Sequence, residues 1–264
     1  MSENNFNRSL RDLPVGHRRH FTSLPSTNRY ALEWIHEHPP EYSLVICDEQ
    51  TAGYGRHQRI WYAQPGASLT FSLILYPTNL EIKELPLFSP LAALALCNAL
   101  RSMGENVDAM VKWSNDVLLD GKKCAGILAE AVWQGNSLMG LVIGIGVNLR
   151  LTALPPQEKL LFPATSLEEA LGKKVDRSVL LHDILENLFA LRSVFPSPEF
   201  LQHWRQRLAF LGQPVSISNP AGETHTGTFQ DVDEHGYLLL KEKAGRLRSF
   251  PIGDVSLRPE DNSL

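Results

Sequence analysis

Residues 111–128 read VKWSNDVLLDGKKCAGIL, and this stretch decides the fold. Apolar residues dominate Val111–Leu119 and Cys124–Trp133, and between them lies Asp120-Gly121, a dipeptide typical of two-residue hairpin turns. The stretch therefore predicts two antiparallel strands joined by a tight turn. A third apolar run, Leu138–Leu149, follows a second short turn, so we predict a three-stranded meander within a sheet.

Helical and strand-like segments lie on both sides of this meander. Before it, the sequence predicts a helix that begins after Ser26-Thr27, strands over Leu44–Asp48 and Ser68–Tyr76, and a buried helix over Phe88–Met103. After it, helical segments are expected over Ser166–Leu171, Asp176–Phe195 and Pro198–Leu211.

The chain divides into three parts by pattern. Residues 1–20 are polar without periodicity, which predicts a loose N-terminal lead-in. Residues 21–211 carry the helices and strands of one larger domain. Residues 212–264 contain short alternating strands and frequent turns, which favour a small β-barrel.

The composition excludes several classes of function. The net charge of −4 over 264 residues gives no positive field for nucleic acid or anionic lipid. The start, MSENNFNRSL, is unlike a signal peptide, and the apolar runs are too short to span a bilayer. The 3 cysteines show neither metal-ligand spacing nor a disulfide framework. We therefore expect a cytoplasmic protein that binds neither DNA nor membranes.

The loop of residues 53–61, GYGRHQRIW, is the first segment that could carry chemistry. Its glycines let backbone approach an anion, and Arg56 and Arg59 offer cationic forks that match phosphate or carboxylate oxygens. No G-K-[ST] follows, and strand-like sequence rather than a helix comes next, so it is neither a Walker loop nor a dinucleotide fingerprint. Taken alone, the loop is equally typical of an exposed surface turn.

Three further features gain meaning only in combination. Asn115-Asp116 lies within the predicted strand although both residues are poor strand formers, which indicates a bulge or a ligand contact. Lys123 follows a turn, where most lysines are simply exposed. Gly144 and Gly146 interrupt an apolar strand, which predicts close approach by a ligand or a neighbouring strand, although packing alone explains them equally well.

Together these segments resemble the biotin–protein ligases. The resemblance rests on Ser26–Asn28, Gln50 through Trp61, Lys112–Asp116, Lys123–Leu128 and Gly144–Asn148, in the family's order, over roughly residues 20–210. The tail is similar to the family's SH3-like domain at GQPVSI, GYLLL and GDVSLRP. The resemblance implies an α+β fold with a mixed, mainly antiparallel sheet flanked by helices, a catalytic domain that binds biotin and ATP over residues 21–211, and an SH3-like barrel over residues 212–264.

The resemblance also implies residue roles. Biotin binding falls to Ser26, Thr27, Asn28, Gln50, Tyr54, Gly55, Arg56, Lys123 and Gly126. ATP or adenylate binding falls to Arg56, Arg59, Trp61, Asp116 and Asn148, and catalysis to Lys123, Arg56 and Asp116. The substrates would be biotin and ATP with Mg²⁺, without a protein metal site, and the partner a biotin carboxyl carrier protein of acetyl-CoA carboxylase or a related carboxylase. A homodimer is also allowed.

The chain departs from the family pattern at four positions. Tyr54 stands where the family usually has arginine, His57 and Gln58 vary the same loop, and Ser114 replaces the proline of K-W-P-N-D. Only 25 residues precede Ser26, too few for the helix-turn-helix repressor domain of larger members, so we expect a monofunctional ligase. The alternatives are a lipoate–protein ligase and a non-catalytic biotin-sensing module.

Overall fold

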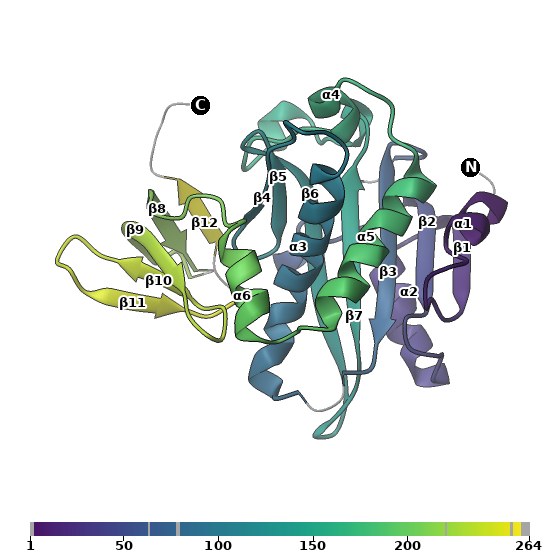
Figure 1. The fold of residues 1–264 in the computed structure, drawn as a ribbon, viewed down its shortest axis with the longest axis horizontal. Helices are drawn as coiled ribbons and strands as arrows, with labels where there is room; N and C mark the ends of the chain where they lie inside the picture. Colours follow the sequence, from purple (N-terminus) through teal and green to yellow (C-terminus); the bar gives the residue numbers. More distant parts are fainter. Residues whose placement is uncertain (1–2, 63, 78–79, 220, 254–255, 260–264) are drawn as a thin grey trace.

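The computed structural model describes residues 3–62, 64–77, 80–219, 221–253 and 256–259. Within these residues, two sheets organise the chain (Figure 1). The larger is a 7-stranded sheet in the order β1-β2-β3-β7-β6-β5-β4. Its strands are β1 Arg18–Leu24, β2 Leu44–Gln50, β3 Ser68–Leu75, β4 Ala109–Lys112, β5 Asp116–Leu119, β6 Lys122–Gln134 and β7 Ser137–Asn148. β1 and β2 run parallel and the other neighbouring pairs antiparallel, which confirms the predicted fold class.

Helices cover both faces of this sheet. Helices α3 (Phe88–Arg101) and α5 (Arg177–Arg192) pack side by side on one face, and α2 (Thr27–Trp34) covers the other (Figure 1). The remaining helices are α1 Glu3–Ser9, α4 Leu167–Leu171 and α6 Pro198–Arg205, and the 3-10 turns are η1 Ile35–Glu37, η2 Arg56–Gln58, η3 Ile82–Leu87, η4 Leu151–Ala153 and η5 Gln157–Lys159. Helix α3 is buried on nearly every side, because it packs against the sheet on one side and against α5, α6 and η3 on others. No helix among the described residues combines the length and apolarity that a bilayer crossing requires.

The expectation of a loose lead-in over residues 1–20 is wrong where the structure describes them. Phe6 of α1 and Leu10, which directly follows the helix, are each 1% exposed and pack in the main core. The guanidinium of Arg177 lies 5.7 Å from the centre of the Phe6 ring. Two apolar residues four positions apart are too few to show a period, so only the contact with α5 reveals this helix.

The single strand predicted over Val111–Leu119 is also wrong. The chain forms β4 and β5, which pair with each other around a turn at Trp113–Asn115. Asn115 therefore lies in the turn and Asp116 begins β5, which explains two poor strand formers at this point. Helix α6 likewise ends at Arg205, earlier than the predicted Leu211.

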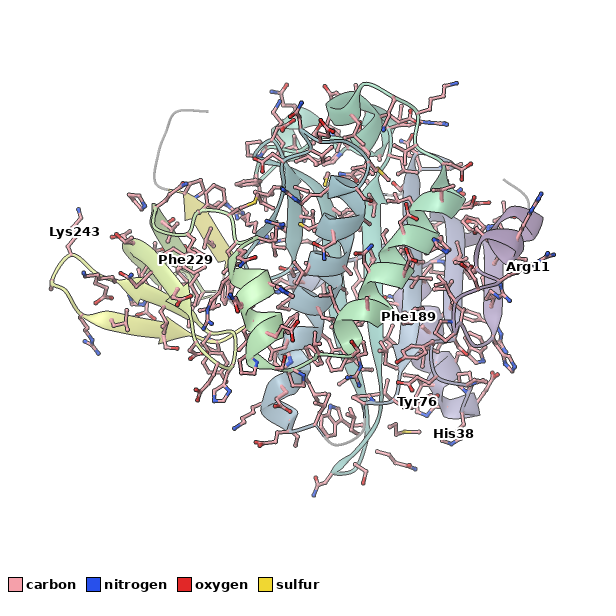
Figure 2. The ribbon with its side chains drawn as sticks, in the orientation of Figure 1. Arg11, His38, Tyr76, Phe189, Phe229 and Lys243 are labelled. Carbon is pink, nitrogen blue, oxygen red and sulfur yellow. The ribbon has the colours of Figure 1, made fainter. Side chains whose placement is uncertain are left out.

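The second unit is a small antiparallel sheet in the order β11-β10-β9-β8-β12, as expected for the SH3-like tail. Its strands are β8 Pro214–Ser218, β9 Thr224–Val232, β10 Leu238–Lys241, β11 Leu247–Phe250 and β12 Ser256–Pro259. Phe229 is fully buried in this unit, whereas Lys243 lies at its far tip (Figure 2). The indole nitrogen of Trp113 donates to the carbonyl oxygen of Gly236 at 3.0 Å, so this sheet contacts the β4–β5 turn.

Candidate active site

One cavity of about 420 Å³ opens beside β6 and β7. It is enclosed by the start of α2, the end of β2, the 53–61 loop, the β4–β5 turn, the segment before α4, and β12 of the small sheet. All the residues to which the sequence assigns a role line it: Ser26, Thr27, Asn28, Gln50, Tyr54, Gly55, Arg56, Arg59, Trp61, Asp116, Lys123, Gly126 and Asn148. The structure thus brings the predicted residues together, while their individual roles stay predictions.

Uncharged hydrogen-bonding groups form one end of the cavity. The backbone N–H of Thr27 donates to Gln50 Oε1 at 2.7 Å, and the Thr27 hydroxyl donates to the same oxygen at 3.1 Å. Thr27 Oγ1 also lies 2.8 Å from Ser72 Oγ on β3. Ser26 caps α2, since its hydroxyl accepts from the backbone N–H of Arg29 at 3.4 Å. This end can hold a small neutral polar ring.

Charged groups form the other end. Lys123 Nζ lies 2.7 Å from Asp116 Oδ1, and Lys112 Nζ lies 3.4 Å from Asp116 Oδ2. Among the residues that the structure describes, the cationic side chains that line the cavity are Arg56, Arg59, Lys112, Lys123, Lys159 and Arg258. The carboxylate that lines it is Asp116. An excess of fixed positive charge in a partly enclosed site attracts phosphates and carboxylates.

The two partners of the buried Lys112–Asp116 pair titrate in different ranges. Burial lowers the pKa of Lys112 to about 8, although Asp116 acts to raise it. Burial alone would raise the pKa of Asp116, but the ammonium groups of Lys123 and Lys112 outweigh it and hold that pKa at about 2. Asp116 is therefore a weak proton acceptor at neutral pH, and the geometry favours it as a counter-charge that orients two lysines.

The glycines of β6 and β7 make room for side chains from other segments. Gly126 and Gly146 are directly opposite each other across the two strands, and a Cβ at Gly146 would overlap the Trp61 indole. A Cβ at Gly144 would overlap the Asn28 amide. The close approach predicted from the sequence is thus made by Trp61 and Asn28. The Trp61 Nε1 donor is buried without a hydrogen-bond partner in the part of the chain that the structure describes, which leaves it available to a ligand.

The 53–61 loop closes on itself and rests on the β4–β5 turn. The backbone N–H of Trp61 donates to the Gly53 oxygen at 2.9 Å, and Tyr54 pairs with Ile60 as an antiparallel bridge. Arg56 Nη1 donates to Ser114 Oγ at 3.1 Å and to Asn115 Oδ1 at 3.0 Å. Arg56 therefore joins the loop to the turn that precedes Asp116.

Three side chains contribute to the site although no role was assigned to them from the sequence. Arg258 enters from β12, and its pKa is lowered by burial and by the charge of Arg59. The Phe162 ring lies 5.0 Å from Lys112 Nζ and 5.8 Å from the Arg258 guanidinium carbon. Glu130 lies on β6 behind the cavity wall. Glu130 follows the Lys123–Leu128 motif by two residues and Arg258 lies within GDVSLRP, but only the folded chain shows that both reach the site.

Comparison with known proteins agrees with this geometry. Residues 20–148 match the Biotin/lipoate A/B protein ligase family, and residues 210–258 match the Biotin protein ligase C terminal domain. The bifunctional ligase/repressor of Bacillus subtilis is 32% identical over 241 residues, which cover 89% of this chain and 72% of that protein. The biotin–[acetyl-CoA-carboxylase] ligase of Paracoccus denitrificans is 35% identical over 220 residues, which cover 80% of this chain and 88% of that protein.

Solved structures give the same result. The biotin protein ligase from Aquifex aeolicus, in complex with biotin and ATP, superimposes on this chain with a TM-score of 0.78 at 28% sequence identity. The superposition covers 92% of this chain and 99% of the Aquifex chain. The mixed sheet, its cavity and the appended small sheet place the protein in the biotin and lipoate ligase class. Within that class, the chain belongs to the biotin protein ligase family.

Proposed function

We propose that this protein joins biotin to AMP at the expense of ATP and then transfers biotin to a lysine of a carrier protein. The observation that carries the proposal is a single cavity with a neutral hydrogen-bonding end at Thr27 and Gln50 and a cationic end at Lys123. Biotin has a neutral ureido ring and a carboxylate, and ATP brings the phosphates. The two ends therefore match the two halves of the activated intermediate.

In the first step, a biotin carboxylate oxygen attacks the α-phosphorus of ATP, and the bond from that phosphorus to pyrophosphate breaks. Lys123, Arg56 and Arg59 offset the charge of the carboxylate and phosphates, which repel each other, so positioning and electrostatic stabilisation supply the catalysis. In the second step, an uncharged carrier amine attacks the biotinyl carbonyl carbon. The bond from that carbon to AMP breaks, and the amine loses a proton.

Mg²⁺ enters this proposal as the companion of ATP. Asp116 is the carboxylate that lines the cavity within the described residues, and both its oxygens already meet lysines. Phosphate oxygens and water would then supply most ligands of the metal, as is usual for nucleotide-bound Mg²⁺.

The carrier, the compartment and the assembly are further parts of the proposal. We assign the acceptor lysine to a biotin carboxyl carrier protein, because relatives are named for ligation to acetyl-CoA carboxylase. The cysteines Cys47, Cys97 and Cys124 are buried and free, which fits the reducing cytoplasm. A homodimer and the lack of DNA binding stay predictions.

Biotin-dependent exchange of pyrophosphate into ATP tests the first step, and labelling of one lysine on a carrier domain tests the second. We expect both with biotin, and neither with lipoate in its place. Exchange with lipoate alone would favour the lipoate ligase alternative. Binding of biotin by folded protein without exchange or labelling would favour a sensing module.

A further inference from the structure

Glu130 lies behind the cavity and joins two residues that line it. The Asn28 side chain donates through Nδ2 to Glu130 Oε2 at 2.7 Å. The Tyr54 hydroxyl donates to the same oxygen at 3.0 Å. Asn28 belongs to α2 and Tyr54 to the 53–61 loop. One carboxylate on β6 therefore connects the uncharged end of the cavity with the loop that closes the cavity.

The Asn28 amide has a single orientation in this network. Its Nδ2 also donates to the Leu128 carbonyl oxygen at 3.2 Å, so both amide hydrogens are engaged by groups that can only accept. The Ser72 hydroxyl donates to Asn28 Oδ1 at 2.5 Å. One lone pair of Oδ1 is then left, and Asn28 can accept a hydrogen bond from a ligand but cannot donate one.

The hydrogen bond from Tyr54 to Glu130 requires a phenol that keeps its proton. Burial, reinforced by the charge of Glu130 and the hydrogen bond to it, raises the pKa of Tyr54 to about 12. The Arg29 guanidinium carbon lies 6.0 Å from the centre of the Tyr54 ring. None of the ion pairs between described residues includes Glu130. The arginine expected here in this family would carry its own charge beside Glu130, whereas tyrosine leaves the carboxylate held by neutral donors.

We propose that Glu130 is a positioning residue that presents the Asn28 oxygen to a ureido N–H of the ligand and, through Tyr54, anchors the loop over it. The inference rests on the proposed function and adds a group that recognises the donors of a cyclic urea. Glu130 does not touch the ligand; it acts through the orientation of Asn28 and the position of Tyr54.

The first test replaces Glu130 by glutamine, which keeps the size and one acceptor oxygen but removes the charge that strengthens both hydrogen bonds. We expect the Kd for biotin in calorimetry to rise roughly 10-fold, the scale set by one hydrogen bond to a charged group. The KM for ATP in pyrophosphate exchange should change less than about twofold. Glu105→Gln, at an exposed glutamate that does not line the cavity, removes the same charge and should leave both values unchanged. An unchanged Kd for biotin, or equal rises for biotin and ATP, would overturn the assignment.

The second test uses biotin methylated at each ureido nitrogen in turn. One methyl group should remove the N–H that Asn28 accepts, and wild type should lose affinity for that analogue. The loss should shrink in Glu130→Gln, because Asn28 is held less firmly as an acceptor when the charge of Glu130 is removed. The assignment is wrong if wild type tolerates both methyl groups, or if the loss is the same in the variant.

Two further variants keep the test decisive if Glu130→Gln does not fold. Ser72→Ala removes the hydrogen bond to Asn28 Oδ1 and should also raise the Kd for biotin. Tyr54→Phe removes the hydrogen bond to Glu130 and should speed dissociation of the adenylate. If neither the Kd nor the dissociation rate changes, the network has no positioning role. Exchange activity of wild type separates the two proposals. Inactive wild type contradicts the proposed function, whereas active wild type with an unaffected Glu130→Gln contradicts only the role of Glu130.

Discussion

Replacing Lys112 by methionine is expected to stabilise the protein at pH 7 while it impairs ligation. The Lys112 side chain is only 6% exposed, and burial lowers its pKa to about 8. Compared with an ordinary lysine pKa of about 10.4, this difference corresponds to about 3 kcal/mol of unfavourable free energy for the buried ammonium group. Methionine has a similar length and fills the space beside Phe162 without a charge, and Asp116 keeps its 2.7 Å partner Lys123.

The gain should depend on pH in a defined direction. The pKa of Lys112 is lower in the folded than in the unfolded state, so between pH 8 and about pH 10.4 the unfolded state binds more protons. Wild-type stability from this group therefore rises with pH through that window. Lys112→Met should be more stable by up to about 3 kcal/mol at pH 7, since the pKa of about 8 already includes the attraction to Asp116, and the advantage should largely disappear near pH 10.4.

Urea unfolding at pH 7 and near pH 10.4 measures both statements, provided that the m-value is unchanged. Lys122→Met is the matched control, because Lys122 is exposed and its replacement should change stability by less than about 0.5 kcal/mol. Pyrophosphate exchange should show a raised KM for ATP in Lys112→Met only. A variant less stable than wild type at pH 7, or a gain that persists at the higher pH, would refute the view that burial of this ammonium group costs stability.

Other substitutions test the remaining parts of the site. Lys123→Ala should lose most pyrophosphate exchange, whereas Lys122→Ala should stay near wild type, since Lys123 lines the cavity and Lys122 does not; equal losses would mean that the site is misplaced. Arg56→Gly removes the bonds to Ser114 and Asn115, so the adenylate should dissociate roughly 10- to 150-fold faster and label added albumin; an unchanged dissociation rate would show that Arg56 does not hold the loop closed. Arg258→Ala should raise the KM for ATP more than the KM for biotin, because Arg258 lies at the cationic end; the reverse pattern would place the nucleotide elsewhere.

The sequence predicts local features well and long-range contacts poorly. The strands around Asp120-Gly121 follow from turn chemistry and apolar runs, and the structure confirms that hairpin. Helix α1 was not predictable, since two buried residues show no period. The division of one predicted strand into β4 and β5 depends on pairing across Trp113–Asn115, although Asn115-Asp116 signalled an irregularity.

The site shows the same limit. The resemblance located the motifs that line the cavity because each motif is a short unbroken stretch of sequence. The structure brings these separate stretches together. Glu130 and Arg258 reach the site through strand pairing and through contact between the two sheets. Glu130 lies on the same face of β6 as Gly126 and Leu128, and Arg258 lies within GDVSLRP, so both positions are close to recognised motifs. The contacts that they make depend on other segments and become visible only once the fold is known.

The hydrogen bond from Trp113 to Gly236 limits how far the two units can be treated as interchangeable modules. Gly236 has a φ of +76°, and a Cβ there would lie 2.5 Å from Leu87 Cδ2, so the loop admits no larger residue without strain. A chimera that takes its C-terminal unit from another ligase must reproduce this loop, or the indole N–H of Trp113 in the β4–β5 turn is left buried without an acceptor. Recombination between relatives should therefore succeed more often when residues 111–116 and 233–237 are inherited from the same parent.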